Sequence, residues 1–280
     1  MNTFPTDAAT VMLLRPCEDA GGKDIEILLV RRNRKSSFVP GYYVFPGGVV
    51  DPGDFCAEIE RFVRGIGRRE ARQILPDMSS ADRALGAWVA GIRETFEEVG
   101  ILLAQTKDGA DVSIFTEDEC RRFSDYRRLL NEGKLTFAAM LEKEELVLPL
   151  HHLHYFSHWI TPEGFPLRYD VRFFISDAPA RQAVSHDGVE LTGHVWLRPA
   201  EALKLYQQGR LDMVLPQIMT LEEISHFKEA AQAITYARRR HVPATLTKIQ
   251  RIDGKDVEVM PDGTVYENRP PSYSWRDDEE

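Results

Sequence analysis

Short runs of apolar residues, many of them β-branched, recur along the chain between polar and glycine-containing segments. Thr10–Leu14 and Ile25–Val30 are two such runs, and Gly21-Gly22 lies between them. Runs of this length bounded by turn residues are typical of strands, so they predict a strand, a turn and a second strand. The same pattern predicts three later strands, at Leu153–Ile160, Tyr169–Ile175 and Val189–Leu197.

The segment from Ser79 to Gly100 follows the spacing of a helix instead. Its apolar residues recur at the intervals of one helix face and are Leu85, Trp88, Val89, Ile92, Phe96 and Val99. Ser79 and Asp82 predict a capping box at the start, and Gly100 is a typical residue just past a helix end. Helical spacing also predicts helices at Pro199–Gln208 and Leu221–Arg238.

Three acidic residues share the polar side of the central helix, Glu94, Glu97 and Glu98. Like charges at i and i+4 cost about 0.2–0.5 kcal/mol, and the helix dipole disfavours negative charge in the last turns. A hard divalent cation offsets this cost, because Mg²⁺ binds carboxylate oxygens together with substrate phosphate oxygens. A solvated acidic face is the alternative interpretation.

The same helix contains Gly86 and Gly91, although a glycine inside a helix costs about 1 kcal/mol relative to alanine. Close approach of another backbone would explain both. We expect the Gly47-Gly48 loop to be that backbone.

Strands before, between and after one central helix predict an α/β fold, with a mixed β-sheet in an α/β/α sandwich. We expect one main domain over residues 1–240, with a helical insertion at about residues 55–80. The insertion carries five arginines. We expect a solvated helix there, and a helix that recognises a remote substrate phosphate is the alternative.

The C-terminal part predicts a separate extension. Thr247–Ile252 and Val257–Met260 flank Asp253-Gly254-Lys255, which is a hairpin signal within residues 241–268. Residues 269–280 are acidic and proline-containing, and we expect disorder there.

Charge and composition restrict the partners. The net charge of −9 argues against a general nucleic-acid binder, because such affinity comes mainly from clustered Lys and Arg. Three widely spaced cysteines form neither a disulfide framework nor a zinc pattern. Because no signal peptide and no long apolar run is present, we expect a cytoplasmic protein with no membrane partner. A homodimer is left open.

Two segments resemble the Nudix box, which reads Gly, five residues, Glu, seven residues, and then Arg-Glu-U-x-Glu-Glu-x-Gly-U, where U is aliphatic. Gly48–Asp54 resembles its first half, with Asp54 in place of Glu, and Arg93–Ile101 resembles its second half, with Thr95 in place of an aliphatic residue. Between Asp54 and Arg93 lie 38 residues instead of seven. Lengthening the loop in this way costs only about 1.5 kcal/mol in closure entropy, so the fold tolerates the interruption.

A Nudix box split by an insertion is similar to that of the coenzyme A diphosphatase subgroup of the Nudix hydrolase superfamily. The segments Ile27–Arg32, Phe38–Gly41, Val44–Gly48, His158–Pro162 and Arg168–Phe174 are also similar to that subgroup. The resemblance implies metal-dependent hydrolysis of the diphosphate bond of a nucleoside diphosphate linked to another moiety, coenzyme A or acyl-coenzyme A foremost. Two alternatives remain: a pyrophosphatase for ADP-ribose or NAD(H), and a non-catalytic sensor of nucleotide ligands on a Nudix scaffold.

The resemblance also implies roles for residues. Glu94, Glu97, Glu98 and Gly48 are expected to hold Mg²⁺ or Mn²⁺, with Glu97 and Glu98 in the catalytic machinery. Arg93 is expected to pair with a carboxylate and hold it in its ligating conformation. Glu190, outside the box, is the candidate general base, and an ordinary loop carboxylate is its alternative interpretation.

Five further residues are candidates for substrate binding: Arg31, Arg32, Gly47, Arg168 and Arg172. Arg168, Asp170 and Arg172 would share one face of a strand, and arginine grips phosphate oxygens with two parallel hydrogen bonds. An exposed Arg–Asp ladder is the alternative. Four histidines between His151 and His158 do not have the partners expected of a zinc site, so we do not predict one.

Overall fold

A mixed β-sheet forms the centre of the protein. The computed structural model describes residues 4–17, 24–186, 188 and 190–266. The strand order in this part of the chain is β10-β2-β1-β9-β8-β11, with β3 paired to β2 and β4 paired to β1. The strands are β1 (Thr6–Cys17), β2 (Asp24–Arg32), β3 (Tyr43–Val44), β4 (Gly47–Val49), β8 (His154–Ile160), β9 (Tyr169–Asp177), β10 (Leu191–Leu197) and β11 (Ala244–Leu246). The β1–β9 and β8–β11 pairs are parallel and the other pairs are antiparallel.

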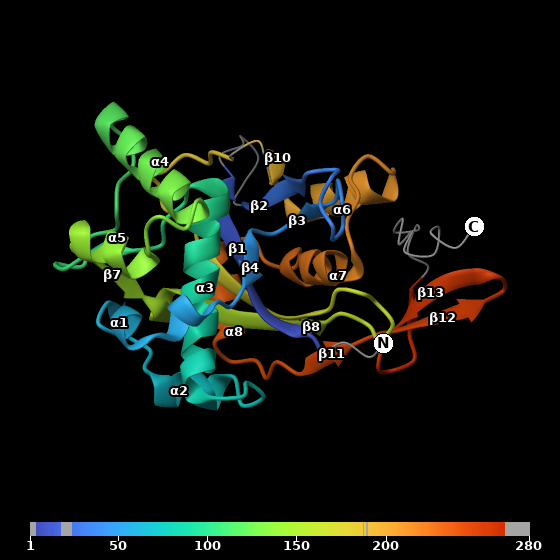
Figure 1. The fold of residues 1–280 in the computed structure, drawn as a ribbon. Coiled ribbons are helices and arrows are strands. Elements are labelled where there is room, and N and C mark those ends of the chain that lie inside the picture. Colours follow the sequence, from blue (N-terminus) through green and yellow to red (C-terminus); the bar gives the residue numbers. More distant parts are fainter. Residues whose placement is uncertain (1–3, 18–23, 187, 189, 267–280) are drawn as a thin grey trace.

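Helices cover both faces of this sheet (Figure 1). One face packs against α3 (Ala81–Val99), and the other packs against α6 (Pro199–Gln207), α7 (Leu215–Ile224) and α8 (Ala230–Ala237). Alternating strand residues supply the two cores: Val11 and Leu13 point to the α3 side, and Met12 and Leu14 to the other. The predicted α/β/α sandwich with a mixed sheet is confirmed.

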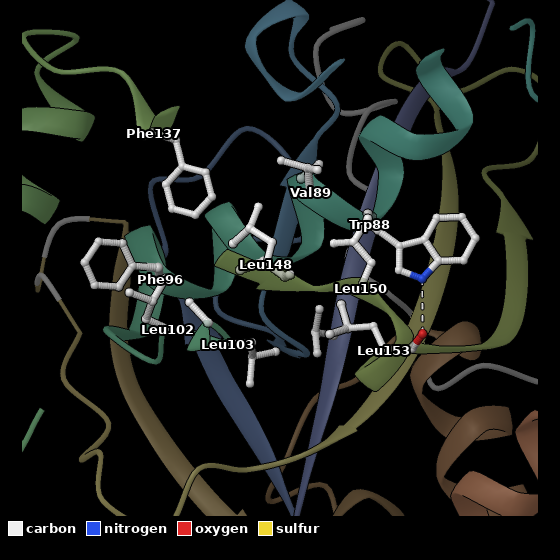
Figure 2. Close-up of a cluster of buried hydrophobic side chains, with 14 of the residues drawn as sticks. Trp88, Val89, Phe96, Leu102, Leu103, Phe137, Leu148, Leu150 and Leu153 are labelled. Atoms are coloured by element: carbon white, nitrogen blue, oxygen red, sulfur yellow. Dashed lines mark hydrogen bonds between the residues drawn. The ribbon is translucent and has the colours of Figure 1, made fainter. Parts of the chain in front are cut away.

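The sequence of α3 determines its ends and its buried face. Ser80, one residue later than predicted, is the N-cap, and its hydroxyl accepts a hydrogen bond from the Arg83 N–H at 3.1 Å. Gly100 ends the helix with φ 73°, in the left-handed region that favours glycine. All six residues of the predicted apolar stripe are buried. Figure 2 shows Trp88 within this core, with its indole N–H donating to the Leu153 carbonyl at 3.1 Å.

The explanation offered for the two helix glycines is wrong. A Cβ on Gly86 would lie 3.0 Å from the Phe55 side chain, and one on Gly91 would lie 3.0 Å from Val11. Both glycines therefore make room for apolar side chains, not for the backbone of the Gly47-Gly48 loop.

The insertion lies beside α3 and is only partly helical (Figure 1). Its elements are η1 (Pro52–Phe55), α1 (Ala57–Glu60), β5 (Val63–Arg64) and α2 (Arg68–Ile74). Several of its arginines form surface ion pairs, such as Arg61 with Glu142 at 3.1 Å and Arg68 with Glu60 at 3.0 Å. A second group of elements, which the hydrophobic pattern did not predict, packs nearby: β6 (Gln105–Thr106), α4 (Glu117–Asn131), α5 (Phe137–Lys143), β7 (Leu146–Pro149) and η2 (Leu150–His152).

The predicted helix Leu221–Arg238 is two helices, α7 and α8. Glu229 begins α8 with a capping box, in which its side chain and that of Gln232 bond each other's backbone N–H, and this local pairing breaks the helical run. The predicted C-terminal hairpin is confirmed as β12 (Lys248–Ile252) and β13 (Lys255–Val259), with β14 (Val265–Tyr266) added at its edge. The predicted Gly21-Gly22 turn and the tail 269–280 lie outside the described residues. None of the helices in the described ranges combines the length and the apolar character needed to cross a membrane.

Candidate metal and substrate site

The last two turns of α3 face the loop at β4, and individual atoms of the two elements are in close contact. The Glu98 carboxylate accepts a hydrogen bond from the Gly47 backbone N–H at 2.9 Å. A Cβ added to Gly48 would lie 2.5 Å from the Glu94 carboxyl carbon, so any other residue there would displace the Glu94 carboxylate. β4 is held in place by its antiparallel pairing to β1, in which Gly47 lies opposite Thr10 and Gly48 opposite Ala9.

Arg93 joins the two halves of the split motif. Its guanidinium bonds both oxygens of Asp54, at 2.8 and 3.0 Å, and Asp54 is fully buried. The same guanidinium contacts Glu94 at 2.9 Å and Glu97 at 3.0 Å. Asp54, the residue that replaces Glu in the motif, therefore anchors the arginine that holds two of the three glutamates.

Burial makes these carboxylates costly to ionise. Loss of solvation, strengthened by Glu97 and opposed by Arg93, raises the pKa of Glu94 to about 7. Desolvation is also the main cause that raises the pKa of Glu97, against the influence of Arg93. For Glu98, desolvation and then repulsion from Glu94 raise the pKa well above its usual value, although the Gly47 N–H acts in the opposite direction.

Arg127 of α4 caps the C-terminal end of α3. Its guanidinium donates to the carbonyl oxygens of Glu97 and Glu98, both at 3.0 Å, and also to the Ser185 hydroxyl at 3.2 Å. A cation at this end opposes the negative pole of the helix dipole, which the glutamates alone would reinforce. Arg127 thus stabilises the turn that presents the acidic residues.

The α3 glutamates and the Gly47-Gly48 segment line one wall of a cavity of about 610 Å³. The sequence-predicted residues in its lining are Arg32, Gly47, Gly48, Arg93, Glu94, Glu97, Glu98 and Glu190. Arg32 lies 3.6 Å from the Glu190 carboxylate, and Asn33 donates its N–H to the Glu190 carbonyl at 2.9 Å. The opposite part of the cavity is mainly apolar and is lined by Phe38, Phe45, Trp159, Phe165, Tyr169, Val171, Phe173 and Val214.

Three predicted substrate-binding residues, Arg31, Arg168 and Arg172, do not line this cavity. Arg31 donates to the Gly41 carbonyl at 3.4 Å, and Arg168 donates to the Thr161 carbonyl at 3.1 Å. Arg172 is 1% exposed and pairs with three carboxylates, Asp7 at 3.0 Å, Asp170 at 3.1 Å and Asp77. Residues distant in sequence have buried this arginine, which strand alternation alone placed on an open face.

A second group of metal-type ligands surrounds Arg172. Among the described residues, Asp77, His158 and Asp170 form the one trio of histidine and carboxylate atoms that all lie within 4.8 Å of one another. The Arg172 guanidinium contacts both aspartates, so its positive charge already balances them in part. A divalent ion at this trio would compete with the Arg172 guanidinium for the same two carboxylates.

The α3 glutamates fit a metal because of their carboxylate chemistry and their position at the cavity. Their oxygens do not meet around one point as that trio does, because Arg93 lies between Glu94 and Glu97. However, the three carboxylates, of which Glu98 is buried and Glu94 and Glu97 are partly buried, have raised pKa values, line an accessible cavity and have one arginine and one N–H among them as direct partners. Carboxylate oxygens in this setting are the ligands that Mg²⁺ and Mn²⁺ prefer.

Sequence reasoning did not find several residues of the site. Asp54 appeared only as a departure from the motif, and its pairing with Arg93 spans the insertion. Arg127 caps α3 from another helix and from about 30 residues away, so the sequence near the end of α3 gave no signal for it. Trp159 lies in a segment similar to the coenzyme A diphosphatase subgroup but was given no role, and the cavity-lining residues Gln217, Thr247 and Glu258 had no signal in the sequence.

Comparison with known proteins identifies the family of this chain. It matches the NUDT19 Nudix domain over residues 6–224. It is 31% identical over 238 residues to the acyl-coenzyme A diphosphatase NUDT19 of Xenopus laevis, a match that covers 76% of this chain and 63% of the frog protein. It is 27% identical over 307 aligned positions to the protein of the same name from Gallus gallus, covering 94% of this chain and 80% of the chicken protein. The chain thus spans 63% of the length of the frog relative.

A solved Nudix hydrolase from Alicyclobacillus acidocaldarius has the same fold. It superposes with a TM-score of 0.68 and 29% identity, covering 83% of this chain and 96% of the other. The resemblance inferred from the split Nudix box is therefore confirmed by sequence and by structure. With a family match that extends over more than half of its residues, the chain belongs to the NUDT19 Nudix domain family.

Proposed function

We propose that this protein hydrolyses the diphosphate bond of coenzyme A or an acyl-coenzyme A, with Mg²⁺ or Mn²⁺ as cofactor. The observation that carries the proposal is the placement of Glu94, Glu97 and Glu98 on one wall of a 610 Å³ cavity, against the glycine loop. The printed names of the frog and chicken relatives support the choice of substrate.

Glu94, Glu97 and Glu98, with the backbone of Gly48, would hold the divalent cation. When bound, such a cation neutralises the diphosphate and lowers the pKa of a coordinated water. Arg93 acts as a positioning residue, because its contacts with Glu94 and Glu97 orient both carboxylates while Asp54 holds the guanidinium.

The remaining cavity residues supply substrate contacts. Arg32 offers a guanidinium to phosphate oxygens, and the backbone at Gly47 lies next to the same space. Glu190 accepts the proton of the attacking water in this proposal and can pass it to solvent, since its side chain is 55% exposed. Attack of the water oxygen on phosphorus breaks the P–O–P linkage and releases the second phosphate as the leaving group.

The partner that fits this cavity is a small molecule rather than a nucleic acid. The net charge of −9 supports that choice. The cytoplasmic location and the homodimer remain predictions of the sequence.

The test is product analysis by mass spectrometry with coenzyme A, an acyl-coenzyme A, ADP-ribose and NADH, each with Mg²⁺ or Mn²⁺. We expect 3′,5′-ADP and a phosphopantetheine species, and loss of turnover in Glu97→Gln. The matched control is Glu142→Gln, which changes an exposed glutamate on α5. Release of AMP and ribose phosphate from ADP-ribose, with coenzyme A intact, would overturn the substrate assignment. Unchanged rates in Glu97→Gln would overturn the metal site.

A further inference from the structure

The C-terminal extension supplies part of the cavity wall. Thr247 directly follows β11, and Glu258 lies in β13. Both residues line the cavity although they are only 2% and 4% exposed, and the Thr247 hydroxyl donates a hydrogen bond to the Glu258 carboxylate. Both lie beyond residues 6–224, the part of the chain that matches the family. The hairpin is therefore a structural component of the cavity.

Two buried polar atoms in the same cavity wall have no hydrogen-bond partner among the described residues. They are the indole Nε1 of Trp159, in β8, and the side-chain amide oxygen of Gln217, in α7. Each residue is 7% exposed, and each lines the cavity. Buried polar atoms are normally paired, so an unpaired donor and an unpaired acceptor at a cavity point to a ligand that supplies both partners.

These residues lie away from the glutamates. The glutamates contact β4, which pairs with β1, whereas Trp159 is on β8 and Thr247 follows β11. The order β1-β9-β8-β11 separates the two regions by up to three strand steps, or roughly 14 Å at about 4.8 Å for each step. A group bound there lies several bonds from the diphosphate that is cut. The surrounding wall is mainly apolar, so it fits an uncharged group.

We propose that Trp159 and Gln217, together with the Thr247–Glu258 pair of the C-terminal extension, form a subsite that recognises an uncharged, amide-bearing segment of the substrate. An amide carbonyl accepts from the Trp159 indole N–H. An amide N–H or a hydroxyl donates to the Gln217 amide oxygen or to the Glu258 carboxylate. This inference rests on the proposed function, because the pantetheine half of coenzyme A carries two amides and a hydroxyl.

Binding of the two halves of coenzyme A, measured separately, distinguishes this subsite from the metal site. Phosphopantetheine carries the amides and 3′,5′-ADP does not, so binding of each fragment to the full-length protein is measured by calorimetry. Trp159→Phe keeps an aromatic ring and removes the N–H, and Glu258→Gln keeps most of the shape and removes the charge. The matched controls are Trp196→Phe, at a residue that lies under Arg15 outside the cavity, and Asp256→Asn, at an exposed position of β13.

We expect Trp159→Phe and Glu258→Gln each to weaken phosphopantetheine binding by about fivefold to tenfold, the usual effect of one lost hydrogen bond, and to leave 3′,5′-ADP binding unchanged. The control variants should bind both fragments like the wild type. Equal loss for both fragments, no loss for either, or a wild-type protein that does not bind phosphopantetheine would overturn the subsite. If the fragment pattern holds while no coenzyme A derivative is hydrolysed, the subsite stands and the proposed activity fails.

Discussion

Replacing Glu94 by glutamine separates the stability of the protein from its metal binding. Burial raises the pKa of Glu94 to about 7, from a usual value of 4.5. Because the folded pKa is the higher one, the stability that this group contributes is greatest below pH 4.5 and is lost as the pH rises to 7. Above pH 7 the metal-free protein bears the full cost of ionising a buried carboxyl group. Glutamine has nearly the same shape and bears no such cost.

The magnitude follows from the pKa difference. A difference of about 2.5 pKa units corresponds to about 3 kcal/mol in the free energy of unfolding at pH 8. At pH 5 the same difference costs less than about 1 kcal/mol. For a chain of this size, 3 kcal/mol corresponds to a change in Tm of roughly 6–12 °C.

Thermal unfolding in EDTA and in excess Mg²⁺ measures both effects. We expect Glu94→Gln to raise the Tm in EDTA at pH 8, to raise it much less at pH 5, and to lose the increase that Mg²⁺ gives the wild type. The control Glu142→Gln should unfold like the wild type throughout. A lower Tm for Glu94→Gln at pH 8 in EDTA, or a full Mg²⁺ response in this variant, would refute the reasoning.

Three other predictions concern the same framework. Gly48→Ala should reduce turnover and the Mg²⁺-induced increase in Tm, because the added Cβ would lie 2.5 Å from the Glu94 carboxyl carbon. A variant with a normal increase in Tm would contradict this, because it would show that the loop moves to accommodate the Cβ. Metal binding should weaken as the pH falls below about 7 and should release protons, since Glu94 must be deprotonated. Calorimetry at pH 6.5 in two buffers of different ionisation enthalpy measures this release. Equal binding heats in the two buffers would show that no proton is released and would contradict the prediction. Arg172→Met should cost about 3–5 kcal/mol in urea unfolding by leaving three aspartates without their buried cation, and a loss below about 1 kcal/mol would contradict this role.

Local sequence patterns were sufficient to predict the elements that depend on neighbouring residues alone. The apolar stripe of α3 predicted its buried face, and the Asp253-Gly254 turn predicted the β12–β13 hairpin. The split Nudix box predicted which glutamates share one wall of the cavity.

Interactions between distant segments were not predictable in this way. Strand alternation placed Arg172 on a polar face, but Asp7 and Asp77, which bury it, lie 165 and 95 residues away. Arg93 needs Asp54 across an insertion whose path the sequence does not specify. Glu258 reaches the cavity only because β11 adds to the edge of the main sheet beside β8, a pairing that hydrophobic pattern does not encode.

Anomalous diffraction from crystals soaked in Mn²⁺ tests the metal assignment most directly. We predict an anomalous peak at the wall formed by Glu94, Glu97 and Glu98, with carboxylate oxygens about 2.1 Å away, and the loss of that peak in Glu98→Gln. A peak only at Asp77, His158 and Asp170, or none at the α3 glutamates, would contradict the account.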